Sequence, residues 1–334
     1  MTTRGWLSAL STAATAALLV ACEGGNIDAG RDLPSGALPV DQRNPVIVAN
    51  DSVTDNWSGE YAMLLASSGG PPLAGIIVNA SAYSAASDLA ANVSGWNELI
   101  EAARASGLPN IPDATASVSD PLVRPADGKI ESTTPNMSDG AKLILDLSTR
   151  LSLPWRPLVV VTGSRLTDVA DAYLMDPTVA DRVVVVSALG AATEAGGVMG
   201  WPNGELDAWA GWIVGQRFRY VQVNGYYDQQ GDVGSKAADL PANPFGAWMA
   251  AKATHVFQIP MSSDQIGVLA LGVPTFVTAV GRAVVDTSAA YDGMTGPPLL
   301  AQADGSAWVV SRCDTAMAAD RLWKMLRDPR TFGQ

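Results

Sequence analysis

The chain has 334 residues, of which 48% are hydrophobic and 16% are charged, and its formal net charge at pH 7 is −12. This length is sufficient for a large hydrophobic core in one big domain or in two small ones. No run of basic residues occurs, so the composition argues against nucleic acid as a partner and is compatible with a neutral small molecule or a cation.

The first predicted element is an export signal at residues 1–21. Arg4 is its only charged residue, and the small apolar run at 13–20 is too short to span a bilayer, which needs about 20 residues. The Leu-Val-Ala-Cys ending resembles a bacterial lipobox, which implies cleavage before Cys22 and lipidation of Cys22. An ordinary signal peptide with an unmodified cysteine is the alternative.

The lipobox resemblance also predicts a location. A multi-acyl anchor at Cys22 would hold the protein at a membrane surface, on the extracytoplasmic side of a bacterial cell envelope. Glu23 follows Cys22, whereas an Asp there would resemble an inner-membrane retention signal, so the outer membrane is favoured.

A flexible tether is predicted to follow the lipidated cysteine. Residues 22–43 are rich in Gly, Pro and Asp and lack apolar periodicity. The other cysteine, Cys313, then has no disulfide partner, and two cysteines are too few for a cysteine-based zinc site. We expect residues 44–334 to form one α/β domain.

Within this domain, strand-like and helix-like segments alternate. Predicted strands lie at 46–48, 73–78, 157–162, 182–186 and 220–223, and later at 275–280, 282–285 and 307–310. Predicted helices lie at 57–66, 85–105, 139–151, 166–174, 208–214 and 314–326, and Ser138 is a good N-cap. Continuous β-branched runs separated by helices indicate a mostly parallel open sheet with helices on both faces.

The stretch that is most informative about chemistry is residues 44–57. Its apolar run at 46–48 stops abruptly in a polar loop that carries Asp51, Asp55 and Asn56. A buried strand that ends in clustered oxygen ligands is how an α/β protein builds a cation or sugar site at the carboxyl edge of its sheet. The alternative is a purely structural role, in which Asp51 and Asp55 only cap the following helix.

Four pieces of the chain resemble, in order, motifs of the inosine–uridine nucleoside hydrolases. Residues 49–56 are similar to the DxDxGxDD loop, and residues 163–168 are similar to the GPLTN turn with one residue added. Residues 203–210 look like the E-F-N-x-W-A segment, and residues 263–265 look like His-Asp-Pro. The resemblance implies a nucleoside-hydrolase-like fold with a Rossmann-like core.

The resemblance also implies an activity, which is Ca²⁺-dependent hydrolysis of the N-glycosidic bond of ribonucleosides to ribose and base. It assigns Asp51 as the catalytic base. The implied metal ligands are Asp51, Asn56, the Thr167 carbonyl and Asp264. The implied ribose-binding residues are Asp55, Glu205 and Asp207. Oxygen donors of this kind suit calcium, and a bound cation would lower the pKa of a water nucleophile.

The chain departs from the family pattern at several of these places. Ala49 replaces the first Asp of the loop, Asn56 replaces its last Asp, Asp207 replaces an Asn, and Ser263 replaces the His. Loss of charged ligands weakens calcium affinity. A catalytically degenerate ligand-binding or envelope protein is therefore the alternative, and a module that shares only the fold is a third. Whether the chain forms a homo-oligomer is left open.

Other side chains near these motifs have two interpretations. His255 is the only histidine and could act as an acid, although a lone histidine is more often packed or on the surface. Several aromatic residues could stack on a base or could fill the core: Trp201, Trp209, Trp212, Tyr226 and Tyr227. The spacing of three between Trp209 and Trp212 favours the core for that pair.

Overall fold

The structure is a computed structural model of the whole chain. It describes residues 38–53, 58–80, 86–117, 120–188, 206–223, 237–256, 264–273, 275–294 and 296–333. The predicted export signal, the lipidation site Cys22 and most of the tether lie outside these residues.

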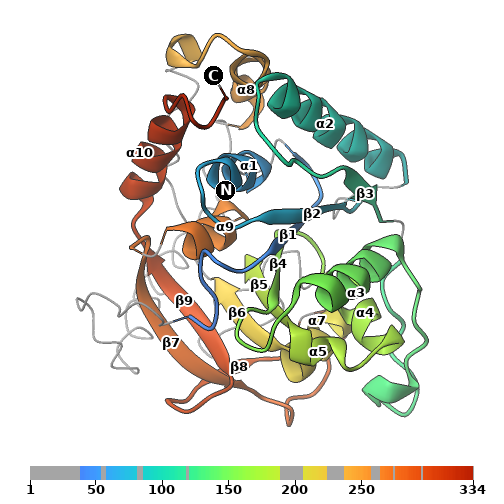
Figure 1. Cartoon of the computed structure of the whole chain (residues 1–334). Helices are drawn as coiled ribbons and strands as arrows, with labels where there is room; N and C mark the ends of the chain where they lie inside the picture. Colours follow the sequence, from blue (N-terminus) through green and yellow to red (C-terminus); the bar gives the residue numbers. More distant parts are fainter. Residues whose placement is uncertain are drawn as a thin grey trace, which may run out of the picture.

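The described strands form a single mixed sheet (Figure 1). The strands are β1 Val46–Asn50, β2 Leu73–Val78, β3 Ala114–Ala116, β4 Leu158–Thr162, β5 Val183–Ala188, β6 Arg219–Val223, β7 Val277–Val285, β8 Leu299–Ala301 and β9 Ala307–Cys313. Their order is β3-β2-β1-β4-β5-β6-β9-β7-β8. Neighbouring strands among β3, β2, β1, β4, β5, β6 and β9 pair in parallel. Strand β7 is antiparallel to both of its neighbours, β9 and β8. The prediction of a mostly parallel sheet is confirmed.

Helices cover both faces of the sheet, as predicted (Figure 1). Those packed on the first face are α1 Ser58–Ser67, α2 Ala86–Ala105, α8 Pro244–Val256, α9 Asp264–Gly272 and α10 Thr315–Leu326. Those packed on the second face are α3 Asp139–Leu151, α4 Thr167–Met175, α5 Val179–Arg182 and α7 Ala208–Arg217. Two short 3₁₀ turns are also present, η1 Ile130–Ser132 and η2 Ala237–Asp239. No described helix is long and apolar enough to cross a membrane.

The β-branched runs form strands because both of their faces are buried. In β4, Val159 and Val161 point into the core on the first face, and Leu158 and Val160 point into the core on the second face. All five residues of β4 are buried. A strand of this kind has no polar face, so its sequence shows a continuous apolar run instead of alternation.

Several predicted boundaries differ from the structure. The predicted strands at 275–280 and 282–285 form one strand, β7. Arg182 ends α5 and does not begin β5. Helices α8 and α9 were not predicted. Both are rich in small and apolar residues and lack the polar stripe that marks a surface helix.

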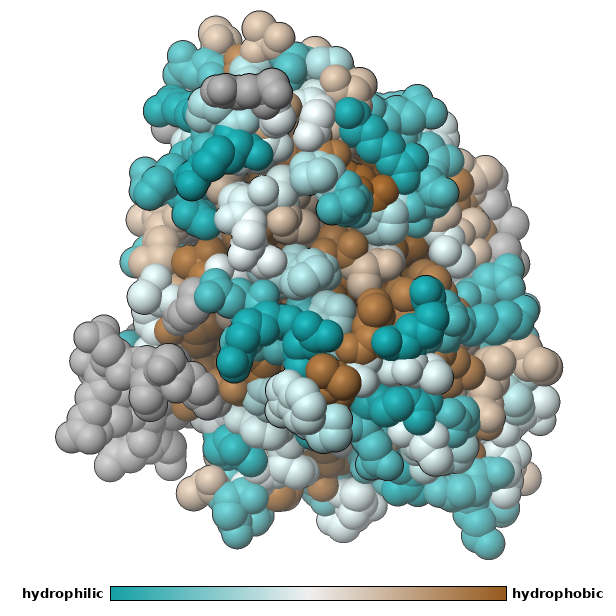
Figure 2. All heavy atoms as spheres, in the orientation of Figure 1, coloured by the Kyte–Doolittle hydropathy of each residue, from teal (hydrophilic) through white to brown (hydrophobic). Residues whose placement is uncertain are grey.

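The face of the molecule in Figure 2 is a mosaic of hydrophilic and hydrophobic side chains. Large hydrophobic side chains that are well exposed are Val123, Met137, Leu153, Trp155, Met294 and Leu300. Isolated surface hydrophobics are ordinary in monomeric proteins, so only their positions in the fold can carry meaning.

Glu60 is a buried acid in the first turn of α1. Its side chain is 1% exposed, and neither carboxylate oxygen has a hydrogen-bond partner among the described residues. Because burial disfavours the charged form, the pKa of Glu60 is raised to about 8. Glu60 therefore carries a proton in the folded protein at neutral pH.

This burial predicts a pH-dependent stability. The folded chain holds the Glu60 proton up to pH of about 8, whereas the unfolded chain loses it near the ordinary value of about 4.5. Unfolding thus releases a proton across this window, and stability falls as pH rises through it. We therefore compare the free energy of unfolding of Glu60→Gln with that of wild type by urea unfolding. We expect the difference, variant minus wild type, to increase by about 3 kcal/mol from pH 5.5 to pH 8. An identical pH dependence in the two proteins would contradict the assignment.

Candidate functional site

The carboxyl ends of the central strands form a polar edge. Five buried polar residues lie at, directly after or one residue before the ends of neighbouring strands: Asn50, Asn79, Ser117, Thr162 and Ser187. Backbone bonds join these ends laterally, from Asn79 N to Asn50 O at 2.9 Å and from Gly163 N to Ala49 O at 3.0 Å. The apolar strands therefore end together, and their polar residues lie at one side of the sheet.

Side-chain amides hold the loops that leave this edge. Asn50 Nδ2 donates to Ser58 Oγ at 2.8 Å, which ties the end of β1 to the start of α1. Asn79 Nδ2 donates to Ser164 Oγ at 2.7 Å and so joins the β2 and β4 loops across the sheet. Sequence reasoning did not find this role of Asn79, because it depends on a contact between distant segments.

Asp51, the predicted base, lies at this edge directly after β1. Its backbone N–H donates to Asn50 Oδ1 at 2.8 Å, and its Oδ1 accepts from Ser52 N at 2.7 Å. Its backbone carbonyl accepts from Trp96 Nε1 of α2 at 2.9 Å. Asp51 is half-buried, so its carboxylate is held by a local bond while the residue remains partly exposed.

Thr167 and Asp207, a predicted metal ligand and a predicted ribose ligand, are in direct contact. Thr167 Oγ1 donates to Asp207 Oδ2 at 2.8 Å, and Leu122 N donates to the same oxygen at 2.9 Å. Asp207 Oδ1 accepts from Ala210 N at 2.9 Å, so Asp207 is also the N-cap of α7. Burial raises the pKa of Asp207, and the hydrogen bonds from Ala210, Leu122 and Thr167 oppose this shift.

The position of Thr167 limits its use as a ligand. Thr167 is the first residue of α4, and the hydrogen-bond ladder of the helix begins at the carbonyl of Leu166. The carbonyl of Thr167 therefore points along the helix axis, toward the N–H of the next turn. Its hydroxyl, and not its carbonyl, is the group that reaches Asp207.

Two further acids of α4 hold the start of α3. Asp168 Oδ1 accepts from Ser117 Oγ at 2.5 Å and from Ser138 Oγ at 2.7 Å, and its Oδ2 is buried with no partner among the described residues. Asp171 accepts from the backbone N–H groups of residues 136–138. This acceptance holds Met137 at φ 58°, a left-handed conformation that is uncommon outside glycine.

These bonds make Asp168 and Asp171 structural. Gly140 of α3 lies against the Asp168 carboxylate, and a Cβ there would be 2.7 Å from Oδ2. Burial, and to a lesser extent the negative charge of Asp171, raise the pKa of Asp168. Negative groups at a helix N-terminus are stabilising, so the pair fixes α3 on α4. The N-cap role predicted for Ser138 is confirmed.

An arginine–aromatic cluster lies beside Asp207. The guanidinium of Arg124 lies 4.8 Å from the ring centre of Tyr291 and 5.3 Å from that of Trp209. Trp209 Nε1 donates to Thr133 Oγ1 at 2.9 Å. Trp209 and Trp212 are both buried, as expected for core residues. The cluster joins the loops around residues 124 and 291 to α7.

Asp264 is the first residue of α9, and the direction of α9 places it at the same edge. Gly267 lies against Val161 and Val186, near the carboxyl ends of β4 and β5, whereas Leu271 lies beside Val46 at the start of β1. Helix α9 therefore runs antiparallel to these strands, and its N-terminus is at the polar edge. The predicted residues Asp55, Asn56, Glu205 and Cys22 lie outside the described residues, as do Trp201, Tyr226 and Tyr227.

The donor chemistry of this edge suits a hard cation. Asp51 and Asp264 place two carboxylate-bearing residues there, and calcium prefers oxygen ligands. The described residues contain no group of three His, Cys, Asp or Glu side chains close enough to hold a metal ion.

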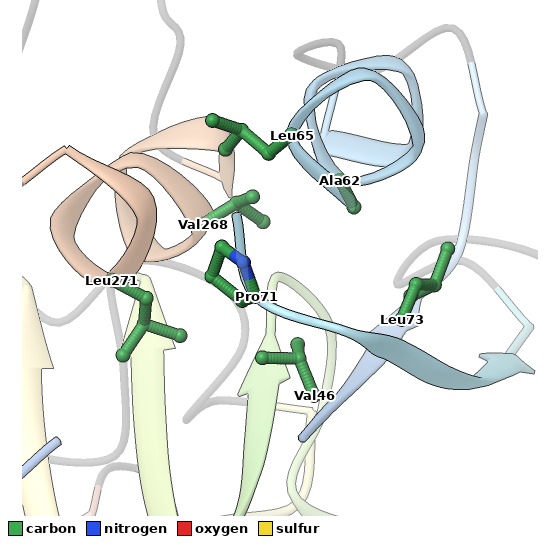
Figure 3. A pocket seen from close by; sticks show the side chains of 7 residues that line it. All are labelled: Val46, Ala62, Leu65, Pro71, Leu73, Val268 and Leu271. Atoms are coloured by element: carbon green, nitrogen blue, oxygen red, sulfur yellow. The ribbon is translucent and has the colours of Figure 1, made fainter. Parts of the chain in front are cut away.

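An apolar pocket lies at the opposite, amino edge of the sheet (Figure 3). It contains about 220 Å³ of space, part of which is open to solvent, and Figure 3 shows side chains from α1, α9, β1 and β2 converging on it. Its lining residues are Val46, Ala62, Leu65, Pro71, Leu73, Val268 and Leu271. With no polar side chain in its lining, this pocket suits neither a sugar nor a cation.

Comparison with solved structures identifies the fold. The inosine–uridine preferring nucleoside hydrolase from Bacillus anthracis superposes with a TM-score of 0.60 at 13% identity, over 85% of this chain and 99% of the other. The plant nucleoside hydrolase PpNRh1 gives a TM-score of 0.57 at 17% identity, over 87% and 100%. A purine-preferring ribonucleoside hydrolase from Gardnerella vaginalis gives 0.56 at 15% identity, over 86% and 100%.

The chain has the nucleoside-hydrolase fold. The expectation drawn from the four sequence segments is therefore confirmed at the level of the fold. No protein-family model and no curated protein sequence matches the chain.

The two oxygens of Asp207 predict an unusual sensitivity to amide substitution. An asparagine keeps one acceptor and places an NH₂ group against donors, so we expect Asp207→Asn to lower the free energy of unfolding by about 1–3 kcal/mol. Asp314 is the matched control, because it caps α10 through Oδ1 alone and asparagine caps equally well. Asp314→Asn should cost less than about 0.5 kcal/mol. Equal losses in urea unfolding would contradict the bracing role of Asp207.

Proposed function

We propose that the protein hydrolyses the N-glycosidic bond of ribonucleosides, releasing ribose and free base, at the carboxyl edge of β1 and β4. The observation that carries the proposal is the position of Asp51. This carboxylate directly follows a buried strand, is held by local bonds, and stands at the strand edge where α/β folds bind ligands. The nucleoside-hydrolase fold supports the same reaction class.

Each proposed residue has a distinct task. As the bond between the sugar and the base breaks, the sugar becomes oxocarbenium-like and is stabilised by nearby negative charge. Water attacks the sugar carbon while Asp51 accepts its proton, and the base departs with the electron pair of the broken bond and takes a proton from solvent. Asp55, Glu205 and Asp207 bind the ribose hydroxyls. A carboxylate has about four acceptor sites, and Asp207 uses three of them internally, so one remains for a substrate hydroxyl.

Calcium is the proposed cofactor. Asp51, Asn56, Asp264 and Thr167 would hold it, with Thr167 the least suited because its carbonyl belongs to α4. When bound, the ion supplies positive charge that lowers the pKa of a coordinated water and orients the ribose diol.

A catalytically degenerate ligand-binding protein is the second candidate. The observation that favours it is the use of the α4 and α7 starts for bracing, since Thr167 and Asp207 bind each other. In that case a nucleoside would stabilise the protein without being cleaved.

We further propose that the chain is lipid-anchored at Cys22 on the extracytoplasmic side of a bacterial envelope, at the outer membrane.

Ribose release tests the activity. The full chain is incubated with a panel of purine and pyrimidine ribonucleosides, with Ca²⁺ and with a chelator, and free reducing sugar is measured. We expect release that the chelator suppresses. A folded protein that releases no ribose from any nucleoside with calcium present would overturn the enzyme proposal, and thermal stabilisation by a nucleoside would then support the second candidate.

Substitution of the proposed base separates chemistry from folding. Asp51→Asn keeps an acceptor for Ser52 N but cannot take a proton, so we expect kcat to fall about 10²–10⁴-fold. The free energy of unfolding should stay unchanged. Asp264→Ala should likewise abolish activity without unfolding the protein. Asp146→Asn is the control, because Asp146 is an exposed residue of α3 that pairs with Arg150. Wild-type turnover in Asp51→Asn would rule out the proposed mechanism.

A further inference from the structure

The amino edge of the sheet, opposite the candidate site, presents an exposed tryptophan. Trp155 is 77% exposed and Leu153 is 40% exposed. Leu153 and Arg156 exchange both backbone hydrogen bonds, at 3.0 Å and 2.9 Å, so Pro154 and Trp155 form the tip of a closed turn. Proline at the first tip position fixes its own φ, which makes the turn rigid. Trp155 is therefore held out into solvent by the backbone.

This turn lies where the N-terminal segment joins the domain. Asn44 Nδ2 donates to Pro157 O at 2.8 Å, and Val159 N donates to Pro45 O at 2.9 Å. Parallel pairing of β1 with β4 brings their starts together, so residues 44–45 and the turn are adjacent. The chain thus passes this turn at residues 44–45, and farther back toward Cys22 it packs Val40 and Leu38 against the core of the first face.

The length of that segment limits how far this edge can lie from an anchor. Residues 23–37 separate Cys22 from the first described residue, and fifteen residues span at most about 50 Å when extended. If they form the flexible tether that their composition predicts, their end-to-end distance would be about 20 Å. A lipidated Cys22 would keep the amino edge close to the bilayer surface.

The charge around the starts of β1, β4, β5 and β6 is close to balanced, although the chain as a whole carries −12. Arginines precede or begin four of the strands that start there: Arg43, Arg156, Arg182 and Arg219. Aspartates pair with two of them, Asp41 with Arg43 and Asp176 with Arg182, and Asp181 lies near Arg219. An acidic protein is repelled by anionic lipid, and this edge is a place where that repulsion is locally cancelled.

We propose that the amino edge of the sheet rests on the surface of a phospholipid bilayer and that Trp155, with Leu153, inserts into the lipid interface. Tryptophan suits this position because its ring is apolar and its N–H needs a polar partner, which the headgroup region supplies. The carboxyl edge, which carries Asp51, then faces away from the membrane and toward solute. This inference rests on the proposed anchor at Cys22 and is independent of any catalytic activity.

Site-directed spin labelling tests this orientation. The full chain, produced with its lipid anchor and with Cys313→Ser, is reconstituted into vesicles of phosphatidylethanolamine and phosphatidylglycerol at 3:1. A nitroxide is placed at Trp155→Cys. Val123→Cys is the matched control, because Val123 is 81% exposed and adjoins Leu122, which binds Asp207 at the carboxyl edge.

We expect oxygen to relax the label at 155 more strongly than a water-soluble nickel chelate does, and the reverse at 123. A label at 155 that is as accessible to the nickel chelate as the label at 123 would overturn the proposal, as would a full chain that does not associate with the vesicles. Quenching by brominated lipid gives a second measurement with the native tryptophan, which wild type should show and Trp155→Ser should lose. Equal quenching in these two proteins also contradicts insertion. Ribose release plays no part in either readout.

Discussion

A parallel sheet that is buried on both faces has few places for polar side chains other than the ends of its strands. In this chain the central strands are continuous apolar runs, and their carboxyl ends change to Asn, Ser and Thr within one residue. A buried polar group is costly unless it is hydrogen-bonded, and Asn50 and Asn79 bond to the segments that follow the strands. The position of Asp51, the start of α1 and the loop at Ser164 depend on this abrupt change.

The second feature of the molecule is that several acids of the candidate region act as structural braces. Asp168 and Asp171 hold the start of α3, and Asp207 joins α4, α7 and the loop at Leu122. Buried carboxylates are costly unless they are bonded, and these bonds offset that cost. Asp51 differs from them, because it is half-buried at the margin of the edge. Of these four described acids, Asp51 is therefore the one whose side chain is most exposed.

The sequence could predict features that depend on local pattern. The β-branched runs predicted β1, β4 and β5, and Ser138 was recognisable as a cap because its signal lies within one turn of its helix. The sequence could not predict α8 and α9, since helices that are apolar on every side lack a 3.6-residue pattern. It also missed the roles of Asn79 and Asp168, whose partners lie 85 and 30–51 residues away. Motif similarity predicted the fold, but it could not show that Asp207 caps α7 and binds Thr167.

We propose that a ribosyl ligand binds at the carboxyl edge of β1 and β4. A crystal structure of the protein with Ca²⁺ and a non-hydrolysable nucleoside analogue would show this binding site. We expect the ribose hydroxyls within hydrogen-bonding distance of the loop that carries Asp51 and of the start of α7 at Asp207. A ligand bound at the apolar pocket of the amino edge, or at any place remote from Asp51, would contradict it.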